Sequence, residues 1–98
     1  MYSKTTLSPL RGMDESRPTI ELDGLTVTTT IPAHNGRDID HRKRVSFETE
    51  HAARRHYFHE IVSLSGEGGR WSAPKRYAPG ANFGTLIDDA GHDIACPV

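Results

Sequence analysis

An Asp-Gly pair at residues 23–24 constrains the fold more than any other feature, because it lies between two alternating runs, TIEL and LTVTTTI. Asp and Gly both tolerate the positive φ angles of a type I′ turn. The sequence therefore predicts a two-residue hairpin with Asp23 and Gly24 as its loop. On the second strand, side-chain alternation predicts an outer row of hydroxyls. This row consists of Thr26, Thr28 and Thr30.

Asn35-Gly36 repeats the hairpin signal and predicts a third strand over residues 38–47. Its apolar positions, expected to point inward, are Ile39, Val45 and Phe47. Its outward positions, expected beside the threonine row, are Asp38, Asp40, Arg42, Arg44 and Ser46.

A helix is predicted to follow this strand. Thr49 is a good N-cap, and Glu48 and Glu50 suit the positive end of a helix. At 100° per residue, four residues form one apolar stripe, which indicates that a single face packs on the sheet. The stripe consists of Ala53, Tyr57, Ile61 and Leu64. Glycines from residue 66 onward predict the end of the helix.

The chain after the helix is rich in Gly and Pro over residues 65–82, which predicts a long loop with a short strand around Trp71. Leu86 and Ile94 then flank an Asp/Ala/Gly turn, which predicts a last hairpin. The expected fold is α+β, a small antiparallel sheet in the order β-β-β-α-β-β with one amphipathic helix on one face.

The first residues, 1–17, show no clear periodicity, so we expect a disordered, flexible tail before a single α+β domain at 18–98. Cys96 is the only cysteine, which excludes an internal disulfide and favours a reducing compartment. No apolar run has the length of a membrane span and no signal-peptide core is present. These features predict a cytoplasmic protein with no membrane partner.

Motifs for catalysis are weak. Cys96 has no predicted scaffold that would lower its pKa. Asp88 and Asp89 fall in a predicted turn, where they act as turn formers rather than as an acid/base pair. His56 and His59 share a helix face, expected to be solvated, but two histidines do not make a zinc site. Further ligands would have to come from His51, His92, Asp93 or Cys96. We therefore expect no enzyme, no cofactor and no metal.

The Gly/Pro-rich loop carries the leading candidate surface, because aromatic residues and arginine are enriched at binding hot spots. The expected partner-binding residues are Arg70, Trp71, Lys75, Arg76 and Tyr77. An alternative is that Trp71 and Tyr77 only cap a thin core. A compact chain without a pocket motif is typical of phage or mobile-element accessory proteins, including inhibitors, so the expected partner is a larger protein or protein complex.

A basic middle segment gives the alternative function. Residues 37–76 hold nine of the twelve Lys/Arg and six of the thirteen Asp/Glu. The candidate nucleic-acid-binding residues are Arg42, Lys43, Arg44, Arg54 and Arg55. The string KRVSFETEHAARRHYF resembles the small arm-binding domains at the N-termini of phage integrases, which implies a basic sheet face that contacts DNA. The competing interpretation is a solvated sheet face of mixed charge, since Glu21, Asp38 and Asp40 share it.

The histidine spacing generates a test for metal. We expect purified protein to contain no stoichiometric zinc and its melting temperature to be unaffected by a chelator, because the face with His56 and His59 offers too few ligands. Metal analysis and a melting curve with and without chelator measure this. One tightly held zinc per chain, lost on His56→Ala, would contradict the expectation.

Overall fold

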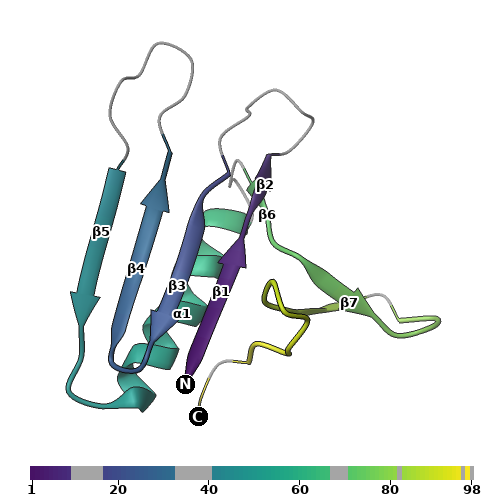
Figure 1. Ribbon diagram of the computed structural model, residues 1–98. Helices are drawn as coiled ribbons and strands as arrows, with labels where there is room; N and C mark the ends of the chain where they lie inside the picture. Colours follow the sequence, from purple (N-terminus) through teal and green to yellow (C-terminus); the bar gives the residue numbers. More distant parts are fainter. Residues whose placement is uncertain (10–16, 33–40, 67–70, 82, 96, 98) are drawn as a thin grey trace.

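The computed structural model describes residues 1–9, 17–32, 41–66, 71–81, 83–95 and 97 (Figure 1). Its centre is an antiparallel four-stranded sheet in the order β1-β3-β4-β5. The strands are β1 (Tyr2–Thr6), β3 (Thr19–Asp23), β4 (Thr26–Ile31) and β5 (His41–Ser46). Helix α1 (Glu50–Ser65) packs on one face of this sheet. The expected α+β class, with one helix on a small antiparallel sheet, is confirmed.

Two short ribbons flank the sheet. β2 (Ser8–Pro9) pairs with β6 (Trp71–Ser72), and β7 (Lys75–Tyr77) pairs with β8 (Gly84–Leu86). Figure 1 shows β7 reaching away from the sheet, on the side of β1 and far from β5. No helix among the described residues is long and apolar enough to cross a bilayer.

The core lies between α1 and the sheet. The buried apolar side chains are Leu7, Ile20, Leu22 and Val27 on the strand side and Ala53, Tyr57 and Ile61 on the helix. The predicted stripe is thereby confirmed, with Leu64 half-buried at its end. Burial of one large aliphatic side chain is worth roughly 2 kcal/mol, so this small set supplies most of the driving force for folding.

The helix begins as its sequence predicts. Thr49 has an extended backbone, and its hydroxyl accepts a hydrogen bond from the Ala52 amide at 3.1 Å. This satisfies one of the free amides of the first turn. The helix ends at Ser65, and the Gly66 amide donates to the Val62 carbonyl at 2.7 Å.

The first hairpin forms as predicted, but its loop is shifted by one residue. Asp23 pairs with Thr26, so the loop residues are Gly24 and Leu25 rather than Asp23 and Gly24. Gly24 has a φ of 60°, a left-handed value that favours glycine. A left-handed residue at the first loop position is typical of two-residue hairpin turns, and Asp23 continues β3.

The expected flexible tail over residues 1–17 is wrong for its described N-terminal part, because Tyr2–Thr6 form β1 and Ser8–Pro9 form β2. The inward positions of β1 are Ser3 and Thr5, both buried. A strand whose buried residues carry hydroxyls shows no apolar alternation, which is why the pattern was not visible in the sequence. Residues 10–16 lie outside the described part of the chain.

The third predicted strand is observed as β5, His41–Ser46. The second turn at Asn35-Gly36, and the placement of Asp38, Ile39 and Asp40, fall outside the described residues. At the end of β5 the predicted alternation holds, since Val45 and the following Phe47 are more buried than their neighbours, whereas residues 41–44 are all exposed.

The segment predicted as a loop at 65–82 is more ordered than expected in its described part. The short strand predicted around Trp71 is confirmed as β6, and Lys75–Tyr77 form β7. The last predicted hairpin is also present. A bridge joins Ile87 to Asp93, and the Ile94 amide donates to the Leu86 carbonyl at 2.8 Å.

The φ of Gly24 generates a test of the hairpin. A Cβ added at this position meets no atom within 4 Å, so any loss of stability on substitution comes from backbone strain alone. Gly24→Val should lower the free energy of unfolding by about 1 kcal/mol or more, because a β-branched residue resists positive φ. Gly24→Asn, which tolerates this conformation, should lose clearly less.

Thermal and urea unfolding of the two variants measure the difference, and 1 kcal/mol corresponds to about 5 °C for a domain of this size. Equal melting temperatures for wild type and the valine variant would contradict the assigned turn.

Candidate functional site

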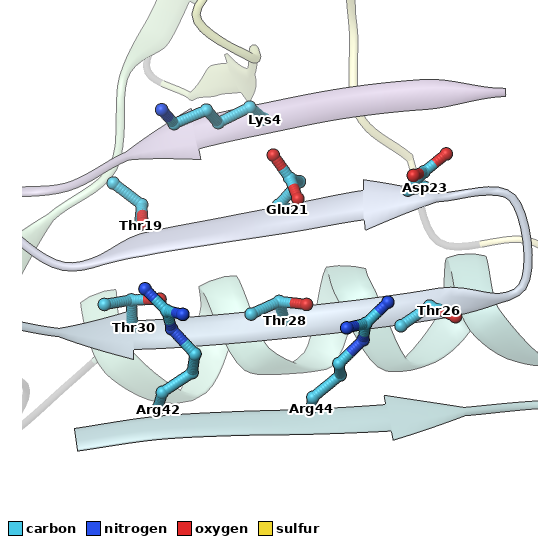
Figure 2. A pocket seen from close by; sticks show the side chains of 9 residues that line it. All are labelled: Lys4, Thr19, Glu21, Asp23, Thr26, Thr28, Thr30, Arg42 and Arg44. Atoms are coloured by element: carbon cyan, nitrogen blue, oxygen red, sulfur yellow. The ribbon is translucent and has the colours of Figure 1, made fainter.

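The face of the sheet opposite α1 is uncovered by any described element, and we call it the open face. Strand register places its side chains in three rows that cross all four strands. The rows are Tyr2, Asp23, Thr26 and Ser46; Lys4, Glu21, Thr28 and Arg44; and Thr6, Thr19, Thr30 and Arg42. A shallow hollow of about 400 Å³ lies over this face, and Figure 2 shows the side chains that line it.

The predicted position of Arg42 and Arg44 beside the threonine row is confirmed (Figure 2). Both arginines rise from β5 toward the hydroxyls of β4. Neither forms an ion pair with a described residue. Guanidinium groups beside hydroxyls are suitable donors for phosphate or carboxylate oxygens.

The charge on the open face is nearly balanced. Lys4, Arg42 and Arg44 bring three positive charges, and Glu21 and Asp23 bring two negative charges, which leaves one positive charge. Glu21 also accepts a hydrogen bond from the Tyr2 hydroxyl at 2.7 Å. A polyanion would therefore meet attraction along β5 and repulsion along β3.

The other predicted nucleic-acid-binding residues are not brought together with this pair. Lys43 points to the opposite face, where its ammonium donates to Glu60 on α1 at 3.2 Å. Arg54 and Arg55 are exposed on α1, on the far side of the sheet. The structure thus unites two of the five predicted residues and separates the rest.

The ribbon of β7 and β8, with its connecting turn, forms a second candidate surface, which we call the hairpin surface. Lys75, Arg76 and Tyr77 are all exposed on β7, as expected for binding residues. Trp71 instead packs against the core, and Arg70 lies outside the described residues. The hairpin surface also contains Phe83, which is 86% exposed and was not identified from the sequence.

The two sides of the ribbon differ in chemistry. A Cβ at Gly84 would lie 2.8 Å from Cβ of Lys75 and 2.9 Å from the Tyr77 ring, so both side chains flank the same glycine. Arg76 points to the other side, where it bonds to the Gly91 carbonyl and pairs with Asp93 at 2.7 Å. Arg76 therefore joins the ribbon to the following turn, and Lys75 and Tyr77 remain available.

A buried polar network lies behind β1. The Tyr57 hydroxyl is 2.8 Å from the Ser3 hydroxyl and 2.7 Å from that of Thr5, and Ser3 donates to Asp88 at 2.8 Å. Asp88 also accepts from the amides of Ala90 and His92. This confirms Asp88 as a turn former, and it extends that role to a contact with the first strand.

The network sets the protonation of its members. Burial opposes ionisation of Asp88, but the hydrogen bonds from the His92 amide and Ser3 outweigh it, so the pKa of Asp88 is lowered. Burial raises the pKa of Tyr57, although its bonds to Ser3 and Thr5 act the other way. Ser3 donates to a carboxylate and not to an imidazole, an arrangement that holds the chain together rather than activating a nucleophile.

The histidines are placed differently from one another. His59 is exposed, as expected, but the ring of His56 packs against Phe47 with centroids 5.0 Å apart and approaches Glu60 at 3.4 Å. Within the described ranges, no group of three or more His, Cys, Asp or Glu side chains is arranged to hold a metal ion.

The Asp88 network generates a test by pH. Because the folded-state pKa is lowered, the stability that ionised Asp88 contributes is present above its ordinary value of 3.8 and is lost as pH falls through the folded value. Asp88→Asn keeps an acceptor for the turn amides but removes the charge. It should therefore lose less free energy of unfolding than wild type between about pH 5 and pH 2.

Urea unfolding across this pH range measures the effect, with Asp23→Asn as the control for an exposed carboxylate. Asp88→Ala, which removes the acceptor altogether, should cost about 2 kcal/mol at neutral pH. Identical pH dependence in wild type and Asp88→Asn would contradict the role given to the charge.

Comparisons with protein-family models, curated proteins and solved structures find no match to this chain. The resemblance to integrase arm-binding domains therefore stays a resemblance of sequence pattern. The open face and the hairpin surface are the two candidate functional surfaces of the described chain.

Proposed function

We propose that this protein is a non-catalytic binding protein that contacts a larger protein through the hairpin surface. The observation that supports this most directly is the exposure of two aromatic side chains on one projecting ribbon. Phe83 is 86% exposed and Tyr77 is 59% exposed. Figure 1 shows that the ribbon stands away from the sheet and helix.

Exposed aromatic area is unfavourable in water, at about 25 cal/mol per Å² of apolar surface. Docking would remove this area from water, and rigid aromatic side chains dominate the energy of many interfaces. Lys75 lies on the Tyr77 side of the ribbon, so an apolar pocket with an acidic rim is the complementary surface. Arg76 supports the ribbon from behind through Asp93.

Docking of the hairpin surface into such a pocket suits the role of a small accessory protein, one that acts on a larger host or viral assembly. The support for that role is a small body that carries one projecting ribbon with exposed aromatic side chains. Small folds of this type use grafted surfaces rather than deep clefts.

Nucleic-acid binding through the open face is the second candidate function. It is favoured by Arg42 and Arg44, which have no ion-pair partner among the described residues and lie beside a row of hydroxyls. It is disfavoured by Glu21 and Asp23, which share the same hollow. The hairpin surface therefore ranks first.

Paired variants distinguish these functions. Phe83→Ser with Tyr77→Ser should reduce capture of the partner from native host lysate more than tenfold, because each removes a docking aromatic worth about 2 kcal/mol. Arg42→Ala with Arg44→Ala should leave capture nearly unchanged. Tyr2→Ser is the matched control, since Tyr2 is 60% exposed but lies on the open face.

Each variant must first match wild type in circular dichroism and melting temperature, and Phe83→Ser alone is the cleaner change because Tyr77 also packs on Gly84. A duplex titrated at several salt concentrations tests the second function. Duplex binding in the micromolar range at about 0.15 M salt, abolished by the double arginine change, would replace the first function by the second.

A further inference from the structure

The two edge strands of the central sheet, β1 and β5, differ in whether their outward backbone groups are hydrogen-bonded. At the β1 edge, the Asp89 amide donates to the Lys4 carbonyl at 2.8 Å. The Asp89 carboxylate accepts from the Thr6 amide at 2.8 Å and from the Thr6 hydroxyl at 2.6 Å. Asp89 thus occupies the Lys4 carbonyl and the Thr6 amide, two outward backbone groups of β1, and obstructs the pairing of a further strand there.

No described residue covers the β5 edge in this way. β4 is its single partner among the described strands. The Phe47 amide donates to the Leu25 carbonyl at 2.8 Å, which makes these opposed residues a hydrogen-bonded pair. Because such pairs alternate along an antiparallel ladder, the backbone N–H and C=O groups of Arg42 and Arg44 point away from β4, toward the open edge.

The side chains along this edge define the kind of strand that fits. Arg42 and Arg44 stand on the open face and lack an ion-pair partner among the described residues. On the helix side, a hollow of about 340 Å³ next to β5 is lined by the apolar Ile31 and Leu64 and by polar residues that include the ion pair of Lys43 and Glu60. An added strand would therefore place alternate residues beside two arginines and the intervening residues beside Lys43, Val45 and this partly apolar hollow.

We propose that the β5 edge binds an extended segment of a partner protein as an additional antiparallel strand, with acidic and apolar residues in alternation. Main-chain hydrogen bonds to Arg42 and Arg44 would supply affinity, and the acidic side chains would supply selectivity. A second copy of β5 is a poor occupant, because it would bring a second basic HRKR run against the first. Charge on an open edge strand prevents such self-pairing.

This surface is separate from the hairpin surface of the proposed function. β5 and β7 lie at opposite sides of the molecule in Figure 1. Binding at one therefore leaves the other accessible, and either proposal can fail while the other holds.

The test uses the whole protein and a short fluorescently labelled peptide of alternating glutamate and valine, measured by anisotropy. The key variants are Arg44→Ala and Arg44→Pro. Both remove the guanidinium, but only proline also removes the outward N–H, and that N–H takes no part in pairing with β4. The affinity of Arg44→Pro for the peptide should be at least about fivefold lower than that of Arg44→Ala. The reason is that proline removes one hydrogen bond and its ring obstructs the added strand.

A peptide N-methylated at its glutamates should lose binding, because in an antiparallel pair the residues opposite Arg42 and Arg44 donate into β5. The same peptide N-methylated at its valines should keep it. A peptide with the glutamates in one block should bind more weakly, and Tyr77→Ser should leave affinity unchanged.

If the proline and alanine variants have the same melting temperature and bind the peptide with equal affinity, the proposal is overturned. It is also overturned by equal binding of the two N-methylated peptides, or by absence of binding by the unmodified alternating peptide. Concentration-dependent self-association that Arg44→Pro abolishes would also overturn it, in favour of a second copy as the occupant.

Discussion

The hydroxyl of Tyr57 holds the first strand to the helix, and the arrangement of the sheet depends on this contact. It bonds to both inward hydroxyls of β1, those of Ser3 and Thr5. Without these bonds, the inner face of β1 would leave polar groups unsatisfied in the core, at a cost of about 1–3 kcal/mol each. With them, a polar strand joins a sheet whose other buried side chains are mainly aliphatic, and the carboxylate of Asp88 extends the network to the last turn.

This network also explains why the two edges of the sheet differ. The same turn that presents Asp88 to Ser3 presents Asp89 to Lys4 and Thr6. Closure of the β1 edge is therefore a direct consequence of how β1 is anchored. No equivalent turn among the described residues reaches β5, whose outward groups and arginines remain accessible.

Local patterns in the sequence predict much of this molecule. The first hairpin signal and strand alternation place Arg42 and Arg44 beside the threonines, and the apolar stripe places α1 on the sheet. The first strand could not be predicted in the same way, because its buried positions are Ser3 and Thr5 and apolar periodicity does not detect them. The exposure of Phe83 and the contact of Asp89 with Thr6, which are 83 residues apart, depend on tertiary packing. No local pattern records either of them.

The distance along the chain between Ser3 and Asp88, 85 residues, has a consequence for biosynthesis. A ribosome makes β1 about 80 residues before the turn that covers its edge. Until that turn emerges, the outward groups of Lys4 and Thr6 have no partner from Asp89, and the nascent chain presents an unprotected strand. Contacts of such long range also slow folding, since their loop must close before they contribute. Protection of the β1 edge therefore waits for the turn at Asp88 and Asp89, and the chain before that point is the form most exposed to mispairing.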